Sequence, residues 1–214
     1  MSNILEFNDK QHEYLLLKKK IPSVTQILAP ISKMMYAKVD DWIINRKAKI
    51  GSRVHKLIEM YNKYNLLPTK DEEEDVLKYF EQYLEFEKSI DSIVFDNEFK
   101  GFYSNNDMVF AGTIDNIRLL NNAMVLIDYK TVANLNEVLL SLQLYGYKLI
   151  AEQTLNIKID EFKALALKKD SFELVDFTKE VNNIKTKELF EKLYDLYKLL
   201  EFHNIKAENM EENC

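Results

Sequence analysis

Apolar and polar positions alternate most clearly between Val109 and Thr131, where two apolar, β-branched runs are broken by Asn121-Asn122. A pair of asparagines tolerates the positive φ angles of a tight type I′ turn, so the pattern predicts a β-hairpin. With those two residues as the turn, the register places Asp115 directly opposite Asp128. Because side chains alternate along a strand, Lys130 shares a face with Asp128.

Two aspartates that face one another on an apolar hairpin need a physical reason. Directly opposed like charges destabilise a strand pair, and aspartate is a poor strand former. A divalent metal held between Asp115 and Asp128, with the Lys130 ammonium beside it, supplies such a reason. The alternative is a solvated pair on an exposed sheet face, or a salt-bridged trio with Lys130. The hairpin alone leaves both interpretations open.

The remaining periodic segments predict alternating helices and strands. In the first part of the chain we expect a hairpin of Ile4–Phe7 and Tyr14–Leu17 around Asn8-Asp9, a short helix that Ser23 caps and Pro30 ends, and helices over Ser32–Arg46, Gly51–Tyr64 and Asp71–Lys88. Farther along we expect a strand over Ile93–Phe102, a helix over Glu137–Glu152, strands over Phe162–Leu167 and Phe172–Val175, and a closing helix from Thr178 or Lys179 to Phe202. No repeat or long linker separates these elements. We therefore expect one domain over residues 1–214, with a core at about 50–170, N-terminal additions at 1–49 and the closing helix at about 178–203.

Two helical residues could serve either structure or chemistry. We expect Trp42, the single tryptophan, to pack in the core, with stacking on a nucleic-acid base as the alternative. His55 lies four residues before Glu59, so the two side chains share one helix face beside a buried stripe. A histidine in that position can be a core residue, a surface residue or a metal ligand.

Composition narrows the class of protein. The chain has 214 residues and is 47% hydrophobic, which is enough for a well-buried core. The single cysteine, Cys214, excludes an internal disulfide framework, a cysteine zinc site and a cysteine-ligated iron–sulfur cluster. No apolar run reaches the length of a membrane span and the first residues lack a signal-peptide pattern, so we expect a soluble, cytoplasmic protein with no membrane partner.

Charge is distributed unevenly along the chain. The formal net charge is -6, which argues against a general nucleic-acid coating protein. Residues 1–70 nevertheless hold 13 Lys and Arg against 6 Asp and Glu, and the remainder is strongly acidic. Residues 1–70 could bind a polyanion while the acidic remainder holds a metal. The alternative is that the imbalance merely reflects solvated acidic helices later in the chain.

The order of these elements resembles the PD-(D/E)XK nuclease superfamily, most closely its RecB-like branch of phage exonucleases and the mitochondrial genome-maintenance exonuclease. Five blocks carry the resemblance, in order: Ile-Pro-Ser-Val-Thr from Ile21, Gly51-Ser-Arg-Val-His55, Gly112-Thr-Ile-Asp115, Ile127-Asp-Tyr-Lys-Thr131 and Gln143-Leu-Tyr-Gly-Tyr147. Each block alone is weak, but five in the right order on the right elements are specific. The resemblance implies an α/β (α+β) fold with a restriction-endonuclease-like core, in which helices flank a central mixed β-sheet.

The resemblance also assigns roles to residues. His55, Asp115 and Asp128 would be metal ligands, joined by the backbone carbonyl of Tyr129, and Lys130 would position or activate the attacking water. The other residues implied to contact nucleic acid or to brace the site are Gln143, Tyr147, Glu98, Ser23, Thr25 and Arg53.

The function that follows is a metal-dependent deoxyribonuclease, more an exonuclease on single-stranded DNA or DNA ends than a sequence-specific endonuclease, in replication, recombination or repair. Hard oxygen ligands suit Mg²⁺, and an imidazole ligand leans the site toward Mn²⁺. The four cysteines of the iron–sulfur relatives and the helicase domain fused to many RecB-like nucleases are missing, so a helicase or recombination partner would be a separate protein. The alternative is a nuclease-fold protein that binds nucleic acid or a protein partner without cutting.

Overall fold

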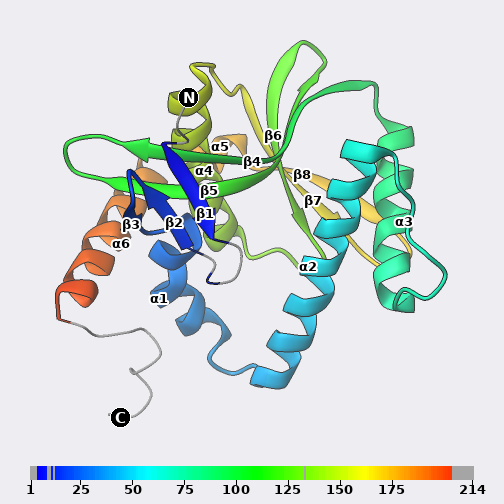
Figure 1. Cartoon of the computed structure of the whole chain (residues 1–214), viewed down its shortest axis with the longest axis horizontal. Helices are drawn as coiled ribbons and strands as arrows, with labels where there is room; N and C mark the ends of the chain where they lie inside the picture. Colours follow the sequence, from blue (N-terminus) through cyan, green and yellow to red (C-terminus); the bar gives the residue numbers. More distant parts are fainter. Residues whose placement is uncertain (1–3, 9–10, 12, 133, 204–214) are drawn as a thin grey trace.

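Two β-sheets organise the chain in the computed structural model, which describes residues 4–8, 11, 13–132 and 134–203 (Figure 1). The small sheet is antiparallel and comprises β1 (Leu5–Asn8), β2 (Glu13–Leu16) and β3 (Lys19–Ile21). The predicted N-terminal hairpin is therefore present, although Asp9 in its turn lies outside the described residues. The central sheet has the order β4-β5-β6-β7-β8, with bounds Ser92–Ser104, Val109–Leu120, Ala123–Lys130, Glu161–Leu167 and Phe172–Asp176.

The central sheet is mixed. Neighbouring strands are antiparallel except β6 and β7, which run parallel and are connected by the crossover helix α4 (Glu137–Leu155). A parallel pair requires such a crossover, because its connection must return to the same end of the sheet. The predicted α/β fold, a mixed sheet flanked by helices, is thus confirmed.

The β5–β6 hairpin has the predicted turn and register. Asn121 and Asn122 have φ angles of 52° and 64°, the positive values that a type I′ turn requires. Leu120 pairs with Ala123, and the ladder continues in that register to Asn116 and Ile127. The next positions along the two strands are those of the two aspartates, so the paired ladder stops where the candidate site begins.

The first two long helices differ from the prediction. Helix α1 (Val24–Tyr36) contains Pro30 instead of ending at it, and its capping box, Ser23 with Gln26, is intact. Proline in a helix costs about 3 kcal/mol, but α1 buries an apolar stripe, Val24, Ile27 and Leu28, against α4 and the closing helix, and this packing carries the helix past the proline. The expected helix over Ser32–Arg46 is therefore wrong, because its first turns belong to α1.

Helix α2 (Asp41–Tyr64) is continuous through Gly51, where we expected a new helix to begin. Glycine is tolerated here because the helix passes very close to the end of β6. A Cβ atom at Gly51 would lie 3.1 Å from Thr131 Oγ1. This close approach brings His55, one turn later on α2, to the end of the β5–β6 hairpin.

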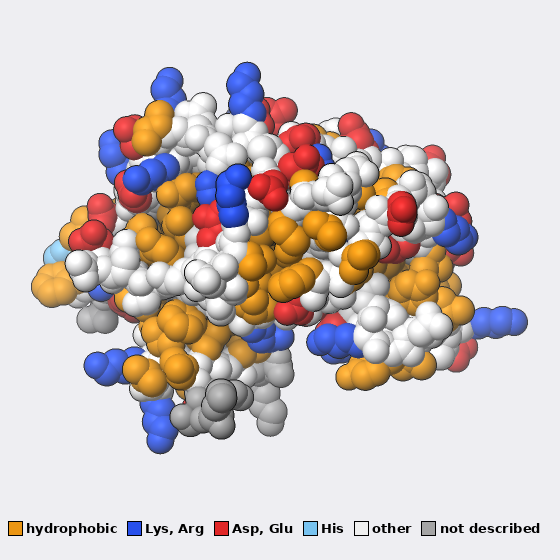
Figure 2. All heavy atoms as spheres, turned by 90° about the horizontal axis from the view of Figure 1, so that it is seen from above, with side chains coloured by type: hydrophobic (Ala, Val, Ile, Leu, Met, Phe, Trp, Pro, Cys, Tyr) orange, Lys and Arg blue, Asp and Glu red, His pale blue; other side chains and the backbone are white. Residues whose placement is uncertain are grey.

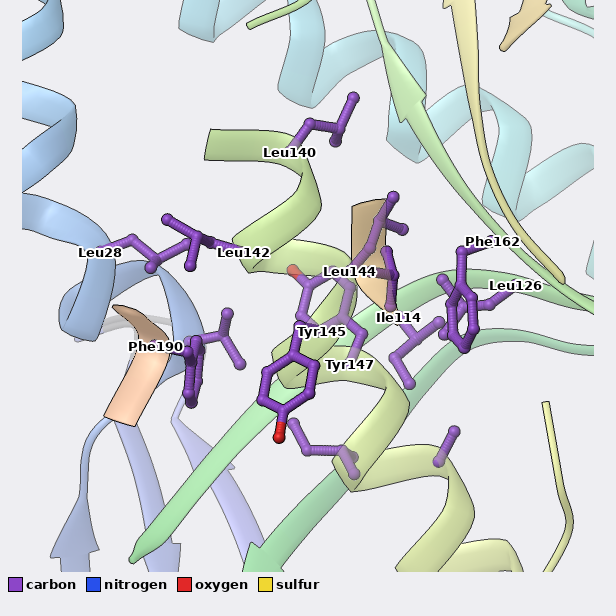
Figure 3. Packing of buried hydrophobic residues seen from close by; sticks show 14 of the residues in the cluster. Leu28, Ile114, Leu126, Leu140, Leu142, Leu144, Tyr145, Tyr147, Phe162 and Phe190 are labelled. Carbon is purple, nitrogen blue, oxygen red and sulfur yellow. The ribbon is translucent and has the colours of Figure 1, made fainter. Parts of the chain in front are cut away.

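The sheet is covered on both faces. On one face α1, α4 and α6 (Ile184–Phe202) enclose the larger core, part of which is drawn in Figure 3. On the other face α2 and α3 (Glu74–Ser89) cover a second cluster that includes Phe80, Tyr83 and Tyr129. The single closing helix predicted from Thr178 is divided into α5 (Thr178–Val181) and α6, because the Asn183 side chain caps a new helix by accepting a hydrogen bond from Lys185 N–H at 3.0 Å.

Two surface features complete the fold. Trp42 is 65% exposed near the start of α2, so the expectation that it packs in the core is wrong. Strand β4 is an edge strand, and α4 covers its last part with side chains. The Thr154 hydroxyl bonds the N–H and C=O of Phe102, and the Gln153 amide bonds those of Ser104. Within the described part of the chain, no helix is both long and apolar enough to cross a membrane.

Candidate metal centre

The candidate site lies where the ladders of β4, β5 and β6 are interrupted. Asn97 pairs with Asn116 and Phe99 with Ile114, so Glu98 stands opposite Asp115 without a paired partner of its own. The β5–β6 register places Asp128 on the other side of Asp115. Three acidic residues therefore form a row across three adjacent strands. Helix α2 adds His55 at one end of this row, and Lys130 projects from the end of β6.

Asp115 is the centre of the cluster. Its Oδ2 accepts a hydrogen bond from Tyr129 N–H at 2.7 Å, and its Oδ1 lies 3.3 Å from His55 Nδ1. The other ring nitrogen of His55 lies 3.0 Å from the Tyr129 carbonyl oxygen, and Glu98 Oε1 lies 4.0 Å from Nδ1. Nitrogen and carboxylate oxygen atoms of His55, Glu98 and Asp115 all lie within 4.8 Å of one another, as metal ligands must.

Asp128 is almost fully buried (1% exposed). Its Oδ2 is in contact with the Lys130 ammonium, which is its only polar partner among the described residues. A buried carboxylate with a single cationic partner keeps further lone pairs available, so it is suited to an additional cationic ligand. The donors are an imidazole, three carboxylates and a carbonyl, which are ligands of Mg²⁺ and Mn²⁺. The residues therefore fit a divalent metal.

The pKa values of the cluster reflect its crowded charges. Burial alone would lower the pKa of His55, but the Asp115 carboxylate and its hydrogen bond outweigh burial and raise that pKa to about 9. Burial raises the pKa of Glu98 to about 7, with the Asp115 charge adding to the effect. Burial also raises the pKa of Asp128 to about 6, even though Lys130 opposes the shift. Two of the three carboxyls thus resist ionisation, which is typical of a site that a cation completes.

These shifts predict that metal-free protein loses stability as the pH rises. The folded pKa of His55 exceeds its unfolded value of 6.5, so its contribution is complete below about pH 6.5 and disappears as the pH passes about 9. The raised pKa values of Glu98 and Asp128 also lower the stability of the metal-free protein as the pH rises from about 4 to about 7. We expect the melting temperature in a chelator to fall from about pH 5 to about pH 9, while the increase caused by added Mn²⁺ grows, because metal binds the deprotonated groups. A Mn²⁺ effect that shrinks with pH would contradict this.

His55, Glu98, Tyr129 and Lys130 line a cleft of about 870 Å³ bounded by the small sheet, α1 and α2, whereas Asp115 and Asp128 are buried and are not among its lining residues. Four lysines contribute to its lining, namely Lys47, Lys56, Lys100 and Lys130, and Lys56 is ion-paired with Glu59. A groove with several ammonium groups near its floor attracts a polyanion such as a nucleic-acid backbone. On the face drawn in Figure 2, Lys and Arg side chains are interspersed with Asp and Glu side chains.

The other residues implied by the resemblance are placed around this cleft, with one difference. Ser23, Thr25 and Tyr147 line it, and Gln143 lines an adjoining hollow of about 220 Å³ beside Lys130. Gln143 Nε2 donates to the Tyr147 hydroxyl at 2.9 Å. Arg53 is not part of the lining within the described residues. Its side chain is half-exposed and forms two hydrogen bonds with Glu72.

All five sequence blocks that suggested the nuclease resemblance thus contribute residues to the cleft or to the adjoining hollow. One group of polar residues near the site was not anticipated from the sequence. Arg118, near the end of β5, is fully buried, and it is hydrogen-bonded to Asn116, the neighbour of Asp115. Its sequence signal is a second charged residue, besides Asp115, in a strand that is mostly apolar.

Comparisons with known proteins identify the family to which the chain belongs. A family model described as the PD-(D/E)XK nuclease superfamily matches residues 40–213. Among solved structures, the chain is similar to one titled "Crystal structure of SSO0001", with 14% sequence identity, a TM-score of 0.47, and coverage of 83% of this chain and 75% of that chain. No curated protein sequence matches significantly. Because the family model extends over most of its length, the chain belongs to the PD-(D/E)XK nuclease superfamily, whose members are metal-dependent nucleases.

Proposed function

We propose that this protein is a metal-dependent deoxyribonuclease of the RecB-like branch, an exonuclease that hydrolyses phosphodiester bonds in single-stranded DNA or at DNA ends. The observation that carries the proposal is the convergence of His55, Glu98 and Asp115 at a lysine-lined cleft, with the ion pair of Asp128 and Lys130 on the adjacent strand. The resemblance of the five blocks to RecB-like exonucleases supports the choice of branch and of DNA. A separate helicase or recombination protein would present the substrate.

In the proposed site, His55, Asp115, Asp128 and the Tyr129 carbonyl hold Mg²⁺ or Mn²⁺, and Glu98 is placed to join them. The bound ion would acidify a water molecule and neutralise charge on the phosphate. Lys130 carries the remaining role. Burial opposes its protonation, but Asp128 and Asp115 more than compensate and raise its pKa, so the side chain remains an ammonium. It therefore orients the attacking water and offsets developing negative charge as a cation.

Cleavage of end-labelled DNA tests the proposal directly. We expect Mn²⁺-dependent degradation of linear single-stranded DNA that a chelator abolishes. A covalently closed circular strand of the same sequence is the matched control, because an exonuclease requires an end. Cutting of the circle would show an endonuclease. Metal-dependent binding of DNA without any cleavage would favour the second candidate, a nuclease-fold protein that binds nucleic acid or a protein partner without cutting.

His55→Ala should weaken Mn²⁺ binding more than Glu59→Ala does. Both residues lie on α2 and line the cleft, but Glu59 is paired with Lys56 and Lys63, whereas His55 contacts Asp115 and the Tyr129 carbonyl. We therefore expect the half-saturating Mn²⁺ concentration for cleavage to rise about 10- to 100-fold in His55→Ala. An unchanged half-saturating concentration, with only a lower melting temperature, would remove His55 from the ligand set.

A further inference from the structure

A row of buried and half-buried polar side chains lies next to the candidate metal ligands. Asn97 precedes Glu98 and Asn116 follows Asp115, and their side chains meet on the opposite side of the strands. Asn116 Nδ2 donates to Asn97 Oδ1 at 2.6 Å, and Nδ2 of Asn62 on α2 donates to the same oxygen at 3.0 Å. One amide oxygen thus links β4, β5 and α2, the three elements that carry Glu98, Asp115 and His55.

Arg118 is hydrogen-bonded to Asn116 and holds this row in place. Its Nε donates to Asn116 Oδ1 at 2.6 Å, its Nη2 to Glu87 Oε1 at 2.7 Å, and its Nη1 to Ser92 Oγ at 3.1 Å. Its guanidinium also lies 5.2 Å from the centre of the Phe86 ring. Because the planar guanidinium has partners in several directions, its orientation is fixed, and with it the orientation of the Asn116 amide.

The row continues to the third strand of the site. Arg118 Nη2 lies 3.5 Å from the hydroxyl of Tyr129, whose carbonyl oxygen faces His55 and whose N–H holds Asp115. Each strand of the acidic row, β4, β5 and β6, therefore has one residue adjacent to its carboxylate that takes part in the network behind the sheet. Burying an arginine costs free energy unless all of its hydrogen-bond partners are in place. Apolar packing would stabilise the fold at least as well, so the network points to a role beyond stability.

Glu98 needs this support most. Its φ of 51° is in the left-handed region, which a residue with a side chain adopts only where the surroundings impose it. The residues on both sides of it remain paired with β5, through Asn97 with Asn116 and Phe99 with Ile114. The side-chain bond between the two asparagines strengthens one of these pairs, so it holds the strained backbone that directs the Glu98 carboxylate toward His55.

We propose that Asn97 and Asn116, anchored by Arg118, are positioning residues that set the spacing of the Glu98 and Asp115 carboxylates for the metal. This role rests on the proposed function, because it presumes that the cluster binds a divalent ion. Neither asparagine reaches the ion itself. Each acts through the backbone of the ligand next to it, as supporting partners of metal ligands generally do.

Mn²⁺ binding by calorimetry, without nucleic acid, tests the proposal. We expect Asn97→Ala and Asn116→Ala to weaken Mn²⁺ binding about 10- to 100-fold. The matched control is Asn183→Ala, which removes the α6 cap far along the chain and costs stability without touching the row. This control should bind Mn²⁺ within about twofold of wild type, since capping affects the helix and not the site.

Rescue separates positioning from folding. Asn97 accepts from both neighbouring amides through one oxygen, so Asn97→Asp keeps an acceptor for both, and its partly exposed position tolerates the charge. We expect Asn97→Asp to recover most of the affinity that Asn97→Ala loses, and thermal melting to show that both variants are folded. Because Asn97 is less buried than Asn116, the comparison stands even if Asn116→Ala does not fold.

The outcomes distinguish this inference from the proposed function. Wild-type affinity in Asn97→Ala, with a melting temperature lowered like that of Asn183→Ala, would show that the row is only structural and would overturn the positioning role. Equal losses in Asn97→Ala and Asn97→Asp would also overturn it, because the acceptor would then be irrelevant. Failure of the wild-type protein to bind Mn²⁺ would instead overturn the metal site, and the positioning role with it.

Discussion

Asp128→Asn should abolish cleavage while leaving the fold intact. Asparagine has the same shape, but it removes the charge and one of the two oxygens from the buried group beside Lys130. We expect the cleavage rate to fall by about 10³-fold or more, since both metal binding and charge stabilisation at the phosphate depend on that carboxylate. A single-turnover assay at saturating DNA measures this. Asp176→Asn, which alters an ion-paired aspartate on β8, should keep the wild-type rate.

The same variant makes a second, thermodynamic prediction. Burial raises the pKa of Asp128 to about 6, so the ionised carboxylate is disfavoured in the folded protein at neutral pH. Metal-free Asp128→Asn should therefore melt at the wild-type temperature or above it near pH 7.5, and it should gain less stability from Mn²⁺. A sharp fall in its metal-free melting temperature would mean that the ion pair with Lys130 supports the fold more than it strains it.

Lys130→Ala should slow the chemical step by about two to four orders of magnitude. The ammonium lies beside Asp128 at the end of β6 and lines both the cleft and the adjoining hollow, so it can reach a water or phosphate oxygen there. Mn²⁺ affinity should fall much less than the cleavage rate, because Lys130 is not itself a metal ligand, although its charge favours the ionised form of Asp128 and so lowers the pKa of that carboxyl. The loss should therefore appear in kcat.

Lys100→Ala is the matched control for this lysine. Lys100 lines the same cleft but is exposed, and its ammonium lies 5.4 Å from the centre of the Phe7 ring. Its loss should raise KM for DNA, because it removes one attraction for the backbone, and should leave kcat nearly unchanged. If Lys130→Ala shows the same KM-only pattern, Lys130 is merely another contact for the polyanion.

Much of the site could be predicted from the β5–β6 hairpin because a two-residue turn sets the register of both strands. Once Asn121 and Asn122 form the turn, the relative positions of Asp115 and Asp128 follow. Glu98 could not be placed in this way. The register of β4 against β5 is set at the connection between Ser104 and Val109, and the sequence does not define that longer connection as sharply as Asn121-Asn122 defines the β5–β6 turn.

Helix boundaries and burial were harder to predict because tertiary contacts decide them. Pro30 and Gly51 are helix breakers by intrinsic preference, yet α1 and α2 continue through them where packing against other elements compensates. Arg118 illustrates the same limit. A charged residue is normally expected at the surface. The burial of Arg118 depends on its pairing with Glu87 of α3, a residue 31 positions earlier in the sequence.

The covering of strand β4 by α4 also bears on how this protein could self-associate. Because Thr154 and Gln153 occupy the edge groups of Phe102 and Ser104, a foreign strand cannot pair with the last part of β4 without displacing them. The first part of the same strand presents Ile93, Val94 and Phe95 to solvent, and an exposed apolar edge is where aggregation begins. Ile93→Lys should therefore improve solubility at high protein concentration. Gln153→Ala should free the edge groups of Ser104, so that a second segment of β4 could pair with a strand of another molecule.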